Sequence, residues 1–232
     1  MGSDMFVDDL ISGADSREEA EIIAKEAVAI AADAKMPLRR WRTNDQKLQK
    51  KLSALCPSEQ EATQLFFQGE DVTKVLGTVW DRERDVLTFE TAAIVEHCAT
   101  IRHRTNLRTV LSVSSRVYDP LGLISPVVIF TLILMQRIWK RRLDWDEELP
   151  AEMKREFWKW VDQLQDLAAV SVPRWYAVNL SKVQESELHV FCDASEKAYG
   201  AVAYLRCTEQ TGRTEVNIIA SRARVAPLDP PT

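Results

Sequence analysis

Apolar residues recur at helical spacing in the first part of the chain. They are Ala20, Ile23, Ala27, Ala31 and Ala34, which share one face of a predicted helix. Ser16 followed by Glu19 forms a capping box at the start of this helix. Pro37 is predicted to stop it, because proline lacks the N–H that a helix needs. A second helix, capped within residues 43–45, is predicted to run through Leu55.

Shorter apolar runs that flank polar turns predict β-strands. Phe6 to Gly13 has the pattern of strand–turn–strand with two acids at the turn, and Leu38 to Trp41 that of a short strand. The runs 75–80 and 86–89 flank the charged stretch 81–85, which is typical of a hairpin with a polar loop.

The middle of the chain, from about residue 91 to 167, is predicted to be helical. The segment 119–122 reads Asp-Pro-Leu-Gly and has proline and glycine at the positions that a type I turn prefers. Ser125 is then expected to cap, and Pro126 to begin, a helix that runs to about Arg142. A further helix is predicted from about 150 to 167.

The last part of the chain changes to β-rich runs at 188–193, 199–206 and 215–221, separated by turn-like stretches. This pattern predicts the opening meander of a second domain, joined to the helices by a linker at 173–186. Helices and strands in separate segments together predict an α+β fold.

Composition limits the kind of protein only loosely. The chain has 232 residues, of which 46% are hydrophobic, so one large domain or two small ones can bury a core. A net charge of −5 argues against a highly basic nucleic-acid coat. Local basic clusters remain, at 39–40, 50–51 and 140–142, and each is equally compatible with a solvated surface.

The cysteines and the apolar runs predict an intracellular location, in the cytoplasm or the nucleus. None of the four cysteines forms a C-x-x-C pair, which argues against a zinc site, and they do not suggest a disulfide framework. The start of the chain lacks the pattern of a secretory signal. The most apolar run, 121–135, is too short for a membrane span, so no membrane partner is expected.

The adjacent acids Asp8 and Asp9 are the first candidates for chemistry. Two neighbouring carboxylates repel each other, and both stay ionised at neutral pH only where cations compensate. Magnesium suits them because it prefers oxygen ligands and accepts substrate phosphates as further ligands. The pair is therefore a candidate for two-metal phosphoryl transfer, and a solvated acidic turn is the alternative.

A series of motifs resembles a known family. Phe6-Val7-Asp8-Asp9-Leu10 resembles the Tyr-x-Asp-Asp motif of reverse transcriptases, and the hairpin around 76–80 resembles their primer grip. The segments 118–126, 139–149 and 221–227 resemble the BEL/Pao group of retrotransposons. The resemblance implies the C-terminal part of a palm at 1–90, a helical thumb or connection at 91–172, and the first strands of ribonuclease H at 187–232.

Within this resemblance, the segment 188–195 is similar to the first-strand signature of ribonuclease H. The matching acid is Asp193, whose counterpart in that family bridges two metal ions. Mg²⁺ is therefore the cofactor implied for Asp8, Asp9 and Asp193. A strand-ending aspartate that only forms a turn is the alternative.

The implied partners are an RNA or DNA template–primer, an RNA–DNA hybrid and the remainder of a polyprotein. Candidate contacts to nucleic acid are Gly77, where a backbone could approach a primer closely, and Lys140, Arg141 and Arg142, which could meet phosphates. A strand bulge is the alternative for Gly77.

The resemblance also sets an expectation about activity. A reverse transcriptase needs a third palm carboxylate that precedes Asp8, and ribonuclease H needs further acids after Asp193. We therefore expect the isolated chain to lack both activities. The alternatives are a non-catalytic nucleic-acid-binding or interaction module derived from such an element, and a remnant without function.

Overall fold

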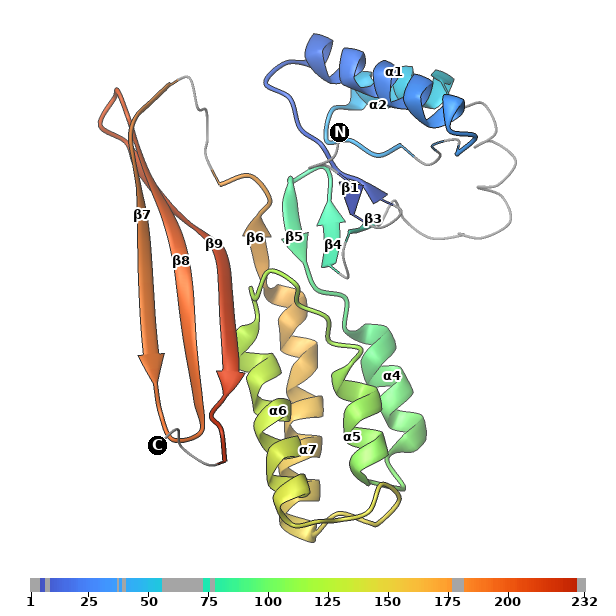
Figure 1. Ribbon diagram of the computed structural model, residues 1–232, viewed down its shortest axis with the longest axis vertical. Helices are drawn as coiled ribbons and strands as arrows, with labels where there is room; N and C mark the ends of the chain where they lie inside the picture. Colours follow the sequence, from blue (N-terminus) through green and yellow to red (C-terminus); the bar gives the residue numbers. More distant parts are fainter. Residues whose placement is uncertain are drawn as a thin grey trace. The chain divides into compact units, whose positions relative to one another are not determined.

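The computed structural model describes residues 5–6, 9–36, 38, 41–55, 73–75, 78–176 and 182–228 (Figure 1). The chain divides into two compact units, Met1–Thr73 and Lys74–Thr232. Helices and antiparallel sheets occur in both units, which is the predicted α+β composition.

The first unit begins with a short hairpin. Strands β1 (Met5–Phe6) and β2 (Asp9–Leu10) pair antiparallel, with Phe6 opposite Asp9. This pairing confirms the two predicted strands, but Asp9 lies in β2 and not at the turn where it was expected. Asp8 lies outside the described residues.

Helix α1 (Arg17–Asp33) starts where its capping residue predicted. The Glu19 backbone N–H donates to Ser16 Oγ at 3.1 Å. The Glu19 carboxylate accepts from the Asp15 N–H at 3.2 Å, one residue earlier than in a standard capping box. The helix ends before Ala34, and Lys35 adopts a left-handed φ of 57°. The chain thus leaves the helix three residues earlier than the expected stop.

Helix α2 (Gln46–Leu55) packs on α1 through a small core of Ala24, Leu48 and Leu52. Asp45 caps α2, because its Oδ1 accepts from the Leu48 N–H at 2.7 Å. The strand predicted at 38–41 is wrong for the two residues of it that are described: Leu38 and Trp41 are not in a strand, and Trp41 packs against the core of the two helices.

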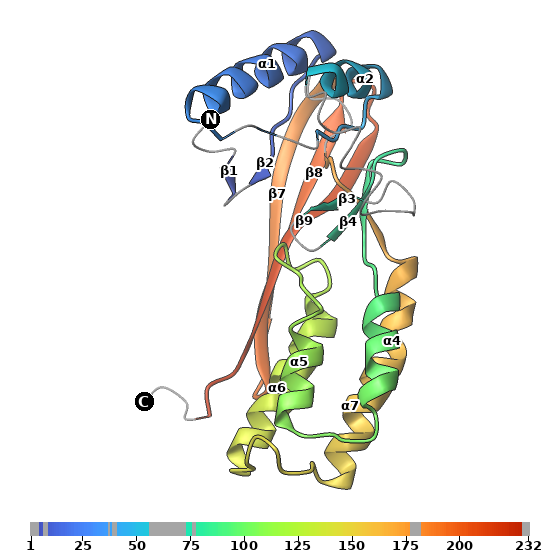
Figure 2. The same cartoon turned by 90° about the vertical axis from the view of Figure 1, so that its right-hand side faces the viewer.

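The second unit contains a helical bundle. Its members are α4 (Ala92–Ile101), α5 (Leu107–Ser114), α6 (Ser125–Lys140), α7 (Ala151–Gln163) and the 3₁₀ helix η1 (Leu164–Ala169). Figure 2 shows α5 beside α6 and α4 beside α7, and these pairs are in contact. The most deeply buried large side chains are Phe157, Leu107, Leu134, Ile138 and Met153. Within the described ranges, no helix is both long and apolar enough to cross a membrane.

A small sheet closes one end of the bundle. Its order is β3 (Thr73–Val75), β4 (Thr78–Asp81), β5 (Val86–Thr88) and β6 (Ser171–Pro173). The predicted hairpin is confirmed, since β4 and β5 pair antiparallel with Asp81 opposite Val86. Strand β6 then pairs with β5. Because β5 precedes α4 and β6 follows η1, this pairing joins the two ends of the helical segment.

The end of the chain forms a three-stranded antiparallel sheet of β7 (Val183–Ala194), β8 (Ala198–Glu209) and β9 (Thr214–Val225), in that order. The predicted meander is confirmed, with strands longer than expected. Strand β7 already begins at Val183, inside the segment expected to be a linker. A register shift between Ala203 and Tyr204 marks a bulge in the pairing of β8 with β9.

The turn before α6 fastens this sheet to the bundle. The predicted turn is present, with the Gly122 N–H donating to the Asp119 carbonyl at 3.2 Å. The Asp119 carboxylate accepts from the N–H groups of Leu123 and Ile124, both at 2.8 Å. Asp119 therefore satisfies the amides ahead of α6, and the expected Ser125 cap is wrong, because Ser125 is already the first residue of the helix.

Strand β9 lies against this turn and along α6 (Figure 1). The Ser221 N–H donates to the Leu121 carbonyl at 2.8 Å, and Ser221 Oγ donates to the Gly122 carbonyl at 2.5 Å. Farther along, Gln136 Nε2 donates to the Ala226 carbonyl at 2.6 Å. These bonds fix the sheet to the helices at the edge formed by β9.

Candidate functional site

Asp193 lies at the end of β7, as the sequence predicted. The strand ends because Ser195 organises a tight turn into β8. Its backbone N–H donates to the Ala198 carbonyl at 2.8 Å, and its Oγ accepts from the Ala198 N–H at 3.2 Å. The Asp193 carboxylate is thereby presented beside the turn, and its Oδ1 accepts from the Ala194 N–H at 2.9 Å.

The neighbours of Asp193 across the sheet are small. Gly200 on β8 lies opposite Asp193, and Ala223 on β9 lies opposite Gly200. A Cβ on Gly200 would lie 3.1 Å from the Arg222 carbonyl oxygen and 3.6 Å from Ala223. This row therefore offers no side chain long enough to cover the carboxylate, and Asp193 is exposed.

On the same face of the sheet, aromatic side chains lie next to Asp193, and charged side chains lie farther from it. Phe191 and Tyr204 meet edge to face, with ring centroids 6.1 Å apart. Beyond them, Arg206 donates to Glu187 at 2.6 Å, and His189 lies 3.4 Å from the same carboxylate. The bond from Arg206, and then that from His189, lowers the pKa of Glu187. Glu187 is therefore engaged by Arg206 and His189, whereas Asp193 has no ion-pair partner among the described residues.

The opposite face of the sheet bounds a groove of about 500 Å³ against α6. Val190 and Ala203 line it from the sheet, and Val128 and Leu132 line it from α6. Because successive residues of a strand point to opposite faces, Asp193 faces away from this groove. The groove and the carboxylate are separate features.

The described part of the chain does not contain a complete magnesium-binding site. Three or more His, Cys, Asp or Glu side chains do not gather anywhere within it in a way that could hold a metal ion. Asp193 offers one carboxylate, and Mg²⁺ needs near-octahedral oxygen ligation. The described residues alone therefore do not fit a two-metal site.

The other acids and the glycine predicted from the reverse-transcriptase motifs fall largely outside the described residues. Asp8 and Gly77 lie outside them. For Asp9 the backbone alone is described, paired in β2. The predicted roles of these three residues stay predictions.

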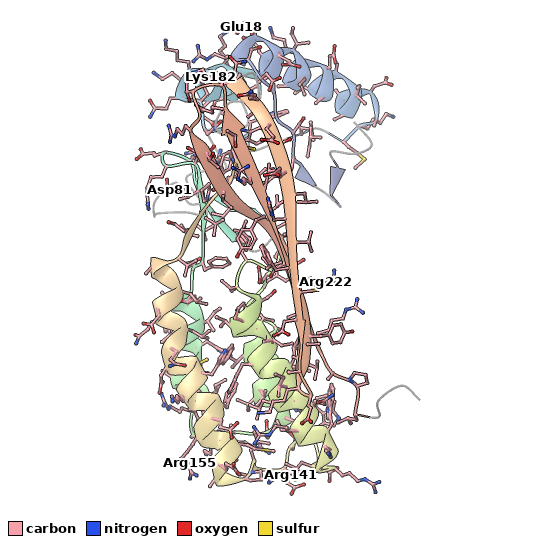
Figure 3. All side chains as sticks on the ribbon, turned by 90° about the vertical axis from the view of Figure 1, so that its left-hand side faces the viewer. Glu18, Asp81, Arg141, Arg155, Lys182 and Arg222 are labelled. Atoms are coloured by element: carbon pink, nitrogen blue, oxygen red, sulfur yellow. The ribbon has the colours of Figure 1, made fainter. Side chains whose placement is uncertain are left out.

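The predicted phosphate contacts lie at the end of α6. Lys140 is the last residue of the helix, Arg141 caps it, and Arg142 has a left-handed φ of 56°. All three are exposed, and none has an ion-pair partner among the described residues. Figure 3 labels Arg141 at this end of the bundle. Cations also stabilise the C-terminal end of a helix through its dipole, so their position has a structural explanation as well.

Sequence reasoning missed the contact between Gly122 and Ser221. A Cβ on Gly122 would lie 1.8 Å from the Ser221 carbonyl oxygen, and its φ of +75° is left-handed. Gly122 therefore allows β9 to approach the turn, and this places the sheet that carries Asp193. The turn motif at 119–122 was visible in the sequence, but its partner 99 residues away was not.

The helices and the antiparallel sheet of the second unit are consistent with a ribonuclease H-like region. A family model described as the Pao retrotransposon-like RNaseH-like domain matches residues 106–232, more than half of the chain. The chain therefore belongs to this family. No curated protein matches the chain.

The match confirms the predicted Pao-type ribonuclease H region and includes Asp193. It begins at Asn106, so the helices α5 to α7 fall within the same match as the sheet. The assignment of the earlier residues to a reverse-transcriptase palm, and the predicted domain limits, stay predictions.

Proposed function

We propose that the chain is part of a retrotransposon reverse transcriptase and ribonuclease H, in which Asp193 helps to cleave the RNA strand of an RNA–DNA hybrid. The observation that carries this proposal is the uncovered carboxylate at the end of β7, within the matched family span. A carboxylate that only formed a turn would need no open row of Gly200 and Ala223 beside it.

Asp193 would act as one ligand for a divalent cation. Such a cation would supply positive charge beside an attacking water and a leaving oxygen, with Asp193 as one of the residues that hold it. The small residues beside Asp193 leave room for the scissile phosphate to approach the carboxylate. The remaining ligands would come from residues outside the described part of the chain, so Asp193 alone is expected to bind the cation weakly.

A manganese titration of the purified chain, followed by NMR, tests this role. Paramagnetic Mn²⁺ should broaden the amide signals of Asp193, Gly200 and Ala223 first. Asp193→Asn should abolish this pattern. Glu185→Gln is the matched control, because Glu185 lies on the same strand eight residues earlier, roughly 27 Å away in an extended chain. Broadening that is unchanged in D193N would contradict the proposal.

In the intact protein, Asp8 and Asp9 would hold magnesium for RNA-directed DNA synthesis. The resemblance of residues 6–10 to the Tyr-x-Asp-Asp motif supports this role, and Asp9 begins strand β2, where it pairs with Phe6. Polymerisation needs a further palm carboxylate, so the isolated chain is proposed to be inactive in both reactions. Primer extension or hybrid cleavage by the purified chain would contradict this.

A second candidate is nucleic-acid binding without catalysis. The exposed and unpaired cations Lys140, Arg141 and Arg142 favour it. In this case an RNA–DNA hybrid, or a template–primer, binds with affinity that falls as salt rises but does not depend on magnesium. Such a protein would act inside the cell, together with the remainder of the polyprotein.

Salt titration of hybrid binding separates the two candidates. Replacing all three cations by alanine should reduce the slope of log affinity against log salt by about 3, roughly one per phosphate contact. Lys25→Ala is the matched control, because Lys25 lies on α1, away from the end of α6 in the sequence, and already donates to Glu21 one turn earlier on α1. A slope unchanged by the triple replacement would rule out this surface.

A further inference from the structure

The outer face of helix α7 carries charged side chains in an unusual order. The cations Arg155 and Lys159 come first along the helix, Asp162 lies in its last turn, and Asp166 follows in η1. All four side chains are exposed. A helix dipole favours acids in the first turn and cations in the last turn, yet α7 has no cation in its last turn. This row of charges therefore opposes the dipole, and the stability of the helix alone does not explain it.

The four charged residues line an open groove of about 650 Å³ along α7. Arg102, which caps α4, also lines this groove, together with Trp158. The Arg102 guanidinium donates to both Asp162 oxygens, at 2.7 and 2.9 Å, and lies 5.0 Å from the centre of the Trp158 ring. These contacts hold the Asp162 carboxylate in place at the groove.

The other three charges of the row are not engaged in this way. Arg155, Lys159 and Asp166 have no ion-pair partner in the part of the chain that the structure describes. Arg155 and Asp166 cannot pair with each other within one copy, because roughly 16 Å of helix, at about 1.5 Å per residue, separates them. A partner for both must come from another molecule.

We propose that α7 pairs with α7 of a second copy of this chain, antiparallel about a two-fold axis that passes midway between positions 160 and 161. Arg155 of each copy then meets Asp166 of the other, and Lys159 meets Asp162. The two-fold axis repeats each contact, so the surface is self-complementary. A parallel pairing would instead set cations against cations. The proposal does not depend on the proposed function.

The register follows from the spacing of the charges. Only with the axis between positions 160 and 161 do both cations meet an acid of the second copy at the same time. A shift that aligns Lys159 with Asp166 leaves Arg155 beyond the acids. A shift that aligns Arg155 with Asp162 sets Asp166 against the uncharged Ala151 at the start of the helix. Charge complementarity thus selects one register.

The proposed dimer is weak. Its two-fold symmetry supplies four ion pairs between the copies, and exposed ion pairs contribute little each and are screened by salt. We therefore expect a dissociation constant between about 0.1 and 1 mM at low salt. Association should weaken steeply as the salt concentration rises.

Sedimentation equilibrium of the full chain at low salt tests the association. The average mass should rise from monomer toward dimer, and no further, as the concentration approaches about 1 mM. Addition of about 1 M salt, at which the screening length is only about 3 Å, should abolish this rise.

A charge swap tests the contact itself. Arg155→Asp and Asp166→Arg should each weaken association by about tenfold or more, because each sets like charges against each other. The combined variant R155D/D166R restores opposite charges across the axis and should dimerise like the wild type. An equimolar mixture of the two single variants should also associate, because the charges of the two chains are complementary.

Two further variants serve as controls. Lys182→Asp makes the same change of charge at an exposed lysine outside α7 and should dimerise like the wild type; Figure 3 labels both Lys182 and Arg155. Lys159→Asp tests the register. It would rescue D166R if Lys159 met Asp166, and it should fail to do so in the register proposed.

Three results would overturn the proposal. One is a wild-type chain that stays monomeric up to about 2 mM at low salt, where a complex of the expected strength forms. Another is a combined variant that associates no better than the single variants, which would mean that Arg155 and Asp166 do not meet. Rescue of D166R by K159D would refute the register.

Discussion

Replacing Gly122 by alanine should detach β9 from the turn that precedes α6. The new Cβ would meet the Ser221 carbonyl oxygen at 1.8 Å and its carbonyl carbon at 2.5 Å, so the strand must move. Movement breaks two hydrogen bonds, from the Ser221 N–H to Leu121 and from Ser221 Oγ to Gly122. The change therefore acts on the packing of sheet against helices.

The loss in free energy of unfolding can be estimated from its separate contributions. A left-handed backbone costs a residue with a Cβ about 1–2 kcal/mol. Two lost hydrogen bonds cost about 0.5–1.5 kcal/mol each. The free energy of unfolding should therefore fall by roughly 2–5 kcal/mol. This is a large part of the stability of an ordinary domain.

Two other glycines separate the cost of the left-handed backbone from the cost of losing the contact with Ser221. Gly212 also has a left-handed φ, of +81°, but a Cβ there would meet nothing within 4 Å, so Gly212→Ala should cost only about 1–2 kcal/mol. Gly13 likewise has open space and no left-handed φ, so Gly13→Ala should change little. Urea unfolding gives the three free energies, and hydrogen exchange of the Ser221 amide reports the contact itself. The reasoning is refuted if G122A costs no more than G212A, or if the Ser221 amide stays protected.

Three further predictions concern the helices and the small sheet. Thr105→Val should lower the free energy of unfolding by about 1–3 kcal/mol, because the buried Trp158 indole N–H donates to the Thr105 hydroxyl at 2.8 Å and would lose its acceptor. Thr105→Ser keeps a hydroxyl and should retain most of the stability, and thermal unfolding of both variants measures the difference. Arg174→Ala should loosen β6 from the β4–β5 hairpin by removing the paired bonds to Asp85, at 2.6 and 2.9 Å; faster hydrogen exchange in β6 would show this, and unchanged exchange would argue against it. The bond from Arg17 holds the pKa of Asp45 at about 2, below its ordinary 3.8. The stability that the Asp45 carboxylate contributes is therefore complete above pH 3.8 and is lost as the pH falls toward 2. An NMR titration in which Arg17→Ala leaves the pKa of Asp45 unchanged would contradict this assignment.

Local signals in the sequence predicted the local structure well. The Ser16 cap, the cap within residues 43–45 and the hairpin at 78–88 depend on residues a few positions apart, and the structure contains all three. Two expectations failed, for different reasons. Trp41 packs on the core of α1 and α2 instead of entering a strand, which depends on residues far along the chain. The cap expected at Ser125 failed for a local reason, because the Asp119 carboxylate accepts from the Leu123 and Ile124 amides ahead of α6.

In the candidate site, too, the local features could be predicted and the long-range ones could not. Asp193 could be placed at a strand end from its own neighbourhood, since the turn around Ser195 follows at once. That Gly200 and Ala223 leave its carboxylate uncovered depends on the register of three strands, which the sequence did not determine. The pairing of β6 with β5 likewise depends on which segments meet, and no local pattern contains that information.

Cleavage of a labelled RNA–DNA hybrid tests most directly whether Asp193 belongs to a ribonuclease H-type site. The protein to assay is a polypeptide that contains this chain and the residues that its gene encodes in frame on either side. We expect magnesium-dependent cleavage of the RNA strand that is abolished in Asp193→Asn and retained in Glu185→Gln. Equal cleavage by wild type and D193N would contradict it.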